Sequence, residues 1–192
     1  VCLLLFSCEK QQAIGDSNSE NLEIHYVDSI YKIRLQAPND SLGREKLLEV
    51  ASEYANRELY IESKQTLKEI FKRATKKKDT LHQAKVYWYL GNVYDNQQKL
   101  DSAFLCYIKA EKLYYLTKRD SLNWARMISY KAGILYNMGI SAESEVQTIR
   151  ALNILSKLKN TQLIYEATLR IALNLKDIKE YSEALKYYNK IP

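Results

Sequence analysis

The sequence predicts an all-α protein in which about four helical hairpins pack side by side in a row. Three observations predict this fold. Residues 84–110 hold two apolar-periodic runs around a polar turn, small residues recur at a nearly constant interval, and the same helix-start signal precedes each interval. The chain of 192 residues is 46% hydrophobic, with only two prolines and five glycines, so it can bury a core and has few helix breakers.

The stretch 84–110 shows the hairpin most clearly. Its first run places four residues at i, i+3, i+4 and i+7, on one face of an amphipathic helix: Tyr87, Leu90, Gly91 and Tyr94. Its second run places Ala103, Tyr107 and Ala110 on one face in the same way. Because Gly91 and Ala103 lack bulk, the two helices can cross closely there while tyrosines fill the space on either side.

The pattern Tyr87-x2-Leu90-Gly91-x2-Tyr94, followed by Ala103-x3-Tyr107, resembles the tetratricopeptide repeat (TPR) signature, with tyrosine replacing the usual Trp and Phe. The resemblance covers residues 41–192. It implies a TPR-like α-solenoid of about four hairpins, a right-handed superhelix that binds proteins without catalysis. The repeat interval is longer than that of the commonest TPR, so somewhat longer helices are expected.

Two columns of small residues mark the expected crossing points. The first column recurs at nearly equal intervals through Ala51, Gly91, Gly133 and Ala172. The second column recurs at almost the same intervals through Ser63, Ala103, Ser144 and Ala184. The third unit matches least well, because Ser144 and Thr148 stand where alanine and an aromatic residue are usual and Gly139 lies one position early in its turn.

A helix-start signal recurs in phase with these columns. Its residue pairs are N-cap types whose side chains accept hydrogen bonds from first-turn amides: Asp40-Ser41, Asp79-Thr80, Asp120-Ser121 and Asn160-Thr161. The helices are predicted over 42–57 and 60–77, 80–96 and 100–118, 121–138 and 141–158, and 161–177 and 181–191. The corresponding repeat units are 41–78, 79–119, 120–159 and 160–192.

The N-terminal residues 1–8 resemble the end of a truncated lipoprotein signal peptide. Leu5-Phe6-Ser7-Cys8 is similar to the lipobox of bacterial lipoproteins, in which cleavage precedes a cysteine that is then acylated. This resemblance implies a protein of the bacterial cell envelope, anchored in the membrane through acylated Cys8. The alternative is a stray hydrophobic N-terminus with an ordinary cysteine.

Two segments follow the signal. Residues 9–20 are polar and predict a flexible linker, and residues 21–38 predict a leading helix that caps the open end of the stack and stops before Pro38. At the other end, the last hairpin is predicted to have an apolar face that needs another helix to cover it, formed by Leu185, Tyr188 and Ile191. We therefore expect a fragment of a longer protein, continuing into more repeats or into a membrane span with a signalling or DNA-binding module.

No constellation of residues indicates an enzyme, a metal site or a cofactor. The two histidines, His25 and His82, lack a cysteine at ligand spacing, and Cys106 is expected to be a buried, inert thiol. Sequence motifs of metalloproteases, phosphate loops and nucleophile elbows are missing. The acidic residues fall on polar helix faces, where they are expected to be solvated.

The net charge of +6 includes a basic run, Lys72-Arg73 and Lys76–Lys78. The run lies at a predicted helix C-terminus, where cations complement the helix dipole. Only Phe71 lies nearby as an aromatic residue, so a base-stacking platform is not indicated and no nucleic acid partner is expected. Contact with anionic lipid headgroups is a weaker alternative.

The TPR resemblance implies that the first helix of each pair lines a concave groove. The positions it assigns are Leu48, Ser52 and Asn56, then Lys85, Trp88, Asn92 and Asn96, then Met127, Tyr130, Ile134 and Asn137, then Glu166, Leu169 and Leu173. Aromatic side chains mixed with amides suit an extended peptide or a partner helix. The alternative is that Trp88 and Tyr130 pack on neighbouring helices. A clamp for a terminal carboxylate is not expected, because Trp88 and Glu166 stand where it needs cations.

The sequence as a whole favours a non-catalytic protein-interaction scaffold, exported and lipid-anchored. The alternative function is the sensory, ligand-detecting region of a membrane-associated signalling protein or transcriptional regulator.

Overall fold

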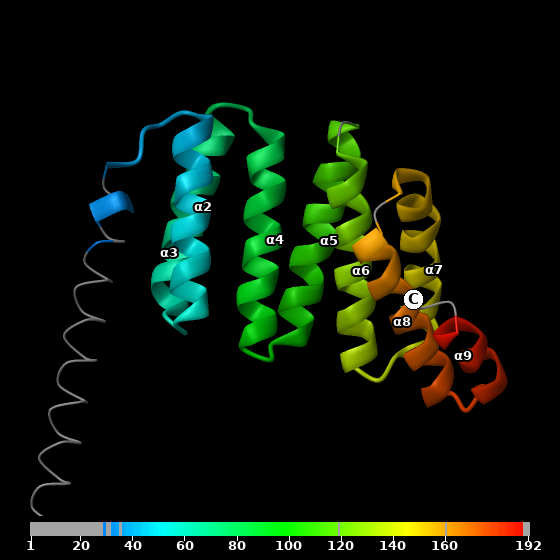
Figure 1. Cartoon of the computed structure of the whole chain (residues 1–192). Coiled ribbons are helices and arrows are strands. Elements are labelled where there is room, and N and C mark those ends of the chain that lie inside the picture. Colours follow the sequence, from blue (N-terminus) through cyan, green and yellow to red (C-terminus); the bar gives the residue numbers. More distant parts are fainter. Residues whose placement is uncertain (1–28, 30–31, 35, 119, 160, 190–192) are drawn as a thin grey trace, which may run out of the picture.

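The computed structural model describes Ser29 and residues 32–34, 36–118, 120–159 and 161–189. Within these residues the chain is all-α and has no strand, which confirms the predicted fold class. Figure 1 shows the helices as a row of antiparallel hairpins. The helices are α2 (Ser41–Asn56), α3 (Tyr60–Lys76), α4 (Thr80–Asn96), α5 (Leu100–Thr117), α6 (Ser121–Asn137), α7 (Ser141–Leu158), α8 (Thr161–Asp177) and α9 (Tyr181–Tyr188).

The helix limits agree with the sequence prediction to within one residue, except at the end of α9. Three of the predicted caps form as expected: Asp40 accepts a hydrogen bond from the backbone N–H of Gly43 at 2.7 Å, and Asp79 and Asp120 cap α4 and α6 in the same way. Asn160, the fourth predicted cap, lies outside the described residues. Local polar chemistry therefore fixes where the first helix of at least three hairpins begins.

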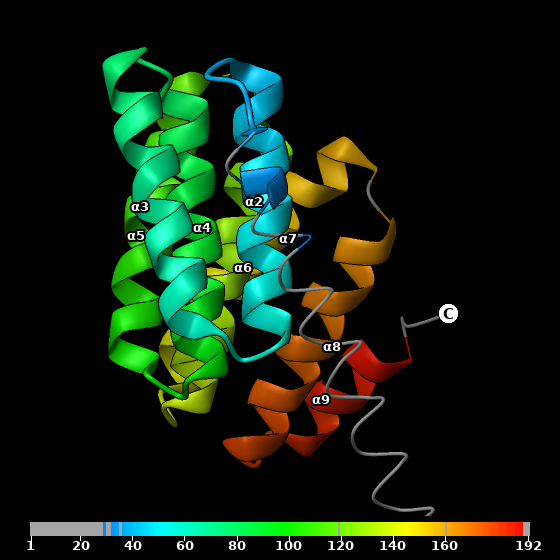
Figure 2. The ribbon, with the colours of Figure 1, turned by 90° about the vertical axis from the view of Figure 1, so that its left-hand side faces the viewer.

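The hairpins form a curved layer with two distinct faces. The first helices, α2, α4, α6 and α8, lie toward the viewer in Figure 1, and Figure 2 shows α3 and α5 on the opposite side. Helix α2 contacts α4, and α6 contacts α8, along the first face. A buried cluster joins each hairpin to the next; its members include Leu47, Ile70 and Val86, then Ala110, Met127 and Ile134, then Ile128, Leu155 and Ala167.

Small residues lie at the helix crossings. A Cβ atom added to Gly91 would come 2.5 Å from Cε1 of Tyr107, so the tyrosine ring of α5 occupies the space that a side chain on α4 would need. The small residues of the second column are at most 3% exposed: Ser63, Ala103, Ser144 and Ala184. Close approach of the paired helices therefore depends on residues with little or no side chain.

The third unit differs from the sequence prediction by one residue. The Ser63 hydroxyl donates to the carbonyl of Ala51 at 2.7 Å, and the Ser144 hydroxyl donates to the carbonyl of Ala132 at 2.7 Å. The crossing residue equivalent to Ala51 is thus Ala132, which is fully buried, and not the half-buried Gly133. Two adjacent small residues allowed either alignment, and the hydrogen bond across the hairpin identifies the correct one.

The hairpin turns confirm this register. Each turn contains one residue with a left-handed backbone, and these residues are Glu58, Gln98, Gly139 and Lys179. Gly139, expected to lie one position early, therefore occupies the equivalent position with φ of 78°. With Ala132 in place of Gly133, the first column of small residues has the same spacing as the second column and as the turns.

Several predictions fall on residues that the structure does not describe. They include the signal peptide with Cys8, the linker 9–20, most of the leading helix 21–38, and Ile191. The described residues before Ala37 are helical: Ser29, 32–34 and Gln36. In the described part of the chain, no helix has both the length and the apolar character that crossing a bilayer requires.

Candidate functional site: the concave groove

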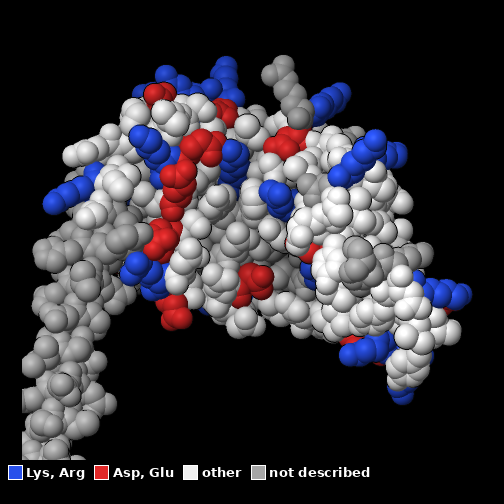
Figure 3. All heavy atoms as spheres, viewed as in Figure 1, with Lys and Arg blue, Asp and Glu red and all other residues white. Residues whose placement is uncertain are grey.

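The corrected register defines the concave groove as the residues at four equivalent positions on α2, α4, α6 and α8. None of them is buried. They are Glu45, Glu49, Ser52 and Asn56; Lys85, Tyr89, Asn92 and Asn96; Arg126, Tyr130, Gly133 and Asn137; and Glu166, Arg170, Leu173 and Asp177. In Figure 3, which views this face, acidic side chains form a line over α2 with basic side chains close by.

Most of the groove residues expected from the sequence belong to this surface. Lys85, Asn92, Asn96, Tyr130 and Asn137 all lie at groove positions. The predicted set lacked seven groove residues: Glu45, Glu49, Tyr89, Arg126, Gly133, Arg170 and Asp177. Arg126 was missed because the sequence prediction shifted the third unit by one residue and so assigned this groove position to Met127.

Met127 was predicted to line the groove, and this prediction is wrong. Its side chain is 0% exposed and packs in the core between α4, α5 and α6. Leu48 and Ile134, also assigned to the groove, are each only 1% exposed. A partner in the groove could not reach these three side chains without unfolding the helices around them.

Trp88 lies beside the groove and packs against groove residues, but it does not occupy one of the groove positions. Its half-buried ring lies 6.1 Å from the Tyr130 ring and 5.4 Å from the Tyr89 ring, measured between centroids. The guanidinium of Arg126 lies 5.2 Å from the Trp88 ring centroid, a cation–π distance. Trp88 therefore supports the aromatic floor of the groove by packing, as the alternative interpretation expected.

A cavity of about 310 Å³ runs across the groove surface of α4. It reaches from α2 on one side to Tyr130 of α6 on the other. Its polar lining residues are Ser52, Asn56, Ser63, Tyr89, Asn92, Asp95, Asn96, Tyr107 and Tyr130. This volume lies at the lower end of the range typical of ligand pockets, and the lining offers hydrogen-bond donors and acceptors in a compact space.

Tyrosines order one side of this cavity. The Tyr107 hydroxyl donates to Oδ1 of Asn92 at 2.8 Å, and the rings of Tyr107 and Tyr130 lie 5.4 Å apart between centroids. Burial raises the pKa of Tyr89, Tyr107 and Tyr130 above the ordinary value of 10.0. These hydroxyls therefore stay protonated at neutral pH and can act as donors.

Asp95 brings a carboxylate to the cavity. Burial raises its pKa above 3.8, and the positive charge of Arg170 offsets only part of this effect. None of the ion pairs found among the described residues includes Asp95. Arg170 instead lies against Gly133, where an added Cβ would come 2.6 Å from its Nη1 atom. The cavity thus presents a half-buried carboxyl group that forms no ion pair with a described residue.

The described residues offer little else for catalysis. They contain no cluster of three or more His, Cys, Asp and Glu side chains that could hold a metal ion. Cys106 is buried as expected, and burial raises the pKa of its thiol to about 11. At neutral pH this thiol is protonated and therefore a poor nucleophile.

No protein-family model matches the sequence, and no curated protein matches it. Solved structures match the fold. The crystal structure of BtubC (BKLC) from P. vanneervenii superimposes with a TM-score of 0.72 at 14% identity, covering 90% of this chain and 71% of that one.

Two further structures agree. The TPR-like repeats of a putative kinesin light chain from Podosopora anserina give a TM-score of 0.68 at 14% identity, covering 90% and 87% of the two chains. MamA gives 0.62 at 19% identity, covering 92% and 85%. Likeness at such low identity concerns the fold and not the function. Together with the repeating hairpins and their buried small residues, it identifies this chain as an α-solenoid of TPR-like repeats.

Proposed function

We propose that the protein is a non-catalytic interaction scaffold that binds a peptide or a partner helix in its concave groove. The cavity across α4 carries this proposal, because it places amides, tyrosine hydroxyls and a carboxylate together on the open face of a rigid repeat stack. Repeat proteins present extended concave surfaces of this kind to their ligands. The amides of Asn56, Asn92 and Asn96 suit the N–H and C=O groups of an extended backbone.

The cavity also favours one class of side chain in the partner. Asp95 takes part in no ion pair among the described residues. Burial and the negative charges of Glu45 and Glu49 raise the pKa of Tyr89, and the positive charge of Arg126 offsets only part of this effect. The rings of Tyr89 and Tyr130 can receive a cation on their faces. A lysine or arginine side chain of the bound segment satisfies both features, so the groove prefers partners with a basic residue at this point.

A peptide panel tests the proposal. Fluorescein-labelled dodecapeptides with a central arginine, lysine, citrulline or glutamate are titrated with the protein, and binding is followed by fluorescence anisotropy. Arginine peptides should bind roughly tenfold more tightly than citrulline peptides, the effect of one partly desolvated ion pair. Tyr130→Ala and Asn96→Ala should weaken all peptides.

Two variants separate the charge effect from general peptide binding. Asp95→Asn should abolish the preference for arginine, whereas Asp101→Asn, on the exposed first turn of α5, should leave it intact. Binding that ignores peptide charge would refute the basic preference alone. Binding that is unaffected by Tyr130→Ala and Asn96→Ala would place the interaction surface elsewhere.

We also propose that the scaffold is exported and anchored in the bacterial cell envelope through acylated Cys8. The sequence Leu5-Phe6-Ser7-Cys8 supports this, followed as it is by polar linker composition. Metabolic labelling with radioactive palmitate should mark the full-length protein, and Cys8→Ala should remove the label. A Cys8→Ala protein that still labels would rule out this anchor.

A further inference from the structure

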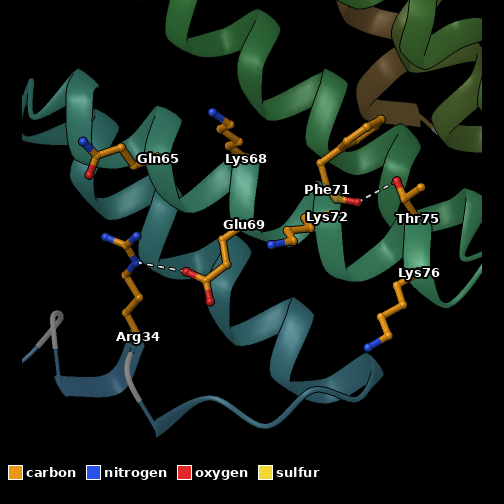
Figure 4. Close-up of a pocket in the computed structure, with 8 residues that line it drawn as sticks. All are labelled: Arg34, Gln65, Lys68, Glu69, Phe71, Lys72, Thr75 and Lys76. Atoms are coloured by element: carbon orange, nitrogen blue, oxygen red, sulfur yellow. Dashed lines mark hydrogen bonds and ion pairs between the residues drawn. The ribbon is translucent and has the colours of Figure 1, made fainter.

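A trough of about 860 Å³ lies on the other side of the molecule from the groove, along the outer surface of α3. Figure 4 shows it between α3 and the segment that carries Arg34. The residues lining it are Arg34, Gln65, Lys68, Glu69, Phe71, Lys72, Thr75 and Lys76. The concave groove does not include any of them, so the proposed peptide site leaves this surface unexplained.

The trough is held open by contacts across it. Arg73 ion-pairs with Glu69 and donates through Nη1 to the carbonyls of Ala37 and Pro38, at 3.1 and 3.3 Å. Arg34 Nε lies 3.4 Å from Oε2 of Glu69 (Figure 4). Two arginines thus neutralise Glu69, the one carboxylate among the described residues that line the trough, and they hold the entering chain against α3. The trough is therefore preformed.

Lysines at four-residue spacing follow the trough: Lys68, Lys72 and Lys76. All three are exposed, and none takes part in an ion pair found among the described residues. The helix dipole, which the sequence suggested as the reason for the basic run, acts within the last turn and does not account for Lys68 in the middle of α3. Like charges at i and i+4 destabilise a helix, so the row is costly without an anionic partner.

We propose that this trough docks an acidic amphipathic helix of a partner protein. Successive lysines rise about 6 Å along α3, which is the rise between acidic residues at i, i+4 and i+8 of a helix lying alongside. Phe71 and the aliphatic stems of the lysines give the trough an apolar floor for the partner's apolar face. The ammonium groups at the rim then meet the partner's carboxylates.

Two other anionic partners fit less well. A bilayer is flat and would touch the rims without filling a hollow of this volume. A single-stranded nucleic acid needs a series of aromatic faces on which successive bases stack, whereas Phe71 is the single aromatic residue among the described residues that line the trough. The apolar floor with a cationic rim favours an amphipathic protein helix over both.

The test uses a labelled helical peptide with Glu at every fourth position and Leu on one face, and a matched peptide with Gln in place of Glu. The full-length protein should bind the Glu peptide, with an affinity that falls as salt is raised, and should bind the Gln peptide weakly. Replacing Lys68, Lys72 and Lys76 by Gln should weaken the Glu peptide about tenfold, the sum of three surface ion pairs.

A matched control carries the same change in net charge. Replacing the exposed lysines Lys112, Lys157 and Lys176 by Gln should leave the affinity unchanged. A further variant, Gln65→Glu, adds an acid to the trough without touching a lysine, and it should also weaken binding of the Glu peptide. Circular dichroism of each variant shows whether the helices are intact.

Three results would overturn the proposal. The first is equal loss of binding in the two triple variants, which would reduce the effect to net charge. The second is lysine-dependent binding to vesicles rich in phosphatidylserine without binding to the peptide. The third is lysine-dependent binding of an oligothymidylate without binding to the peptide. None of these results bears on the concave groove, whose variants lie on other residues.

Discussion

Asp79 and Asp95 lie at opposite ends of α4, in surroundings that differ in almost every respect. Asp79 caps the helix and lies 2.7 Å from Nη2 of Arg44 and 2.7 Å from Nδ1 of His82. Asp95 lines the cavity and forms no ion pair with any described residue. Of these two aspartates, Asp79 is therefore surrounded by hydrogen-bond donors, whereas Asp95 is not.

The pKa values follow the surroundings. Burial raises the pKa of both carboxyl groups, but at Asp79 the backbone N–H of His82 and the Arg44 guanidinium more than compensate, so its pKa is lowered below 3.8. At Asp95 only the more distant Arg170 opposes burial, and the pKa is raised. Asp79 serves the junction between the first two hairpins, whereas Asp95 takes part in no ion pair among the described residues.

The junction at Asp79 is a dense polar network. Arg44 on α2 is only 5% exposed, and His82 is 2% exposed with its Nε2 atom 3.0 Å from Oε1 of Glu45. Lys85 also ion-pairs with Glu45. Removing one member leaves buried charge without a partner, which costs more than the pair contributes when intact. The first two hairpins are thus coupled by charges, and this coupling can be broken at one residue.

The largest effect is expected from Asp79→Ala. The substitution removes a helix cap and strips the nearly buried Arg44 of its carboxylate, so the free energy of unfolding should fall by about 3 kcal/mol. Urea unfolding followed by circular dichroism measures the change.

Asp120→Ala provides the matched control for this prediction. Asp120 accepts from the backbone N–H of Asn123 at 3.0 Å and from its Nδ2 at 2.7 Å, but it has no arginine partner among the described ion pairs. Its loss should cost about 1 kcal/mol, as expected for a cap alone. Equal destabilisation by the two substitutions would show that Arg44 does not depend on Asp79.

A smaller effect is expected from acid. Because the pKa of Asp79 is lower in the folded protein than in the unfolded chain, its contribution to stability is complete above the unfolded value of about 3.9 and is lost as pH falls through the folded value. The stability difference between wild type and Asp79→Asn should therefore shrink as pH is lowered from 7 to 2.5. A difference that stays constant over this range would contradict the lowered pKa.

The sequence predicted the stack well because its determinants are local. N-cap residues, helical periodicity and small crossing residues each act within one hairpin, so helix limits were found to within one residue, except at the end of α9. The register of the third unit was less secure, because Ala132 and Gly133 are adjacent and both small. The intervals between Ser63, Ala103, Ser144 and Ala184 equal those of the first column only if that column includes Ala132, and the hydrogen bond from Ser144 to Ala132 agrees with this register.

The residues that line the groove, and those that form the polar network around Asp79, were harder to predict. The one-residue error in the third unit assigned the groove position of Arg126 to Met127. The contact of His82 with Glu45 was not predicted, because Glu45 lies on the preceding hairpin. The repeat itself contained the missing signal: Glu45 and Lys85 are separated by one full repeat, so they occupy equivalent positions on neighbouring helices and can form an ion pair. Contacts between units can be read from a sequence only after the register is fixed to the residue.

The smallest effect on stability is expected at Asp95, and its sign is opposite to that at Asp79. Because the folded protein raises the pKa of this carboxyl group, the charged form is held at a cost near neutral pH. Asp95→Asn keeps the shape and removes the charge, so it should leave stability at pH 7 unchanged or raise it by about 0.5 kcal/mol. The same substitution should abolish the preference for arginine peptides.

That combination distinguishes a binding residue from a structural one. A loss of more than about 1 kcal/mol in Asp95→Asn would mean that the carboxylate has a structural partner after all, and the contrast with Asp79 would fail. Gains in stability at the expense of binding are characteristic of sites kept open for a ligand, since an unsatisfied group costs free energy until the ligand arrives. Urea unfolding of wild type and variant in the presence of the arginine peptide completes the test, because the peptide should stabilise the wild type more than Asp95→Asn, which retains only the weaker, charge-independent binding.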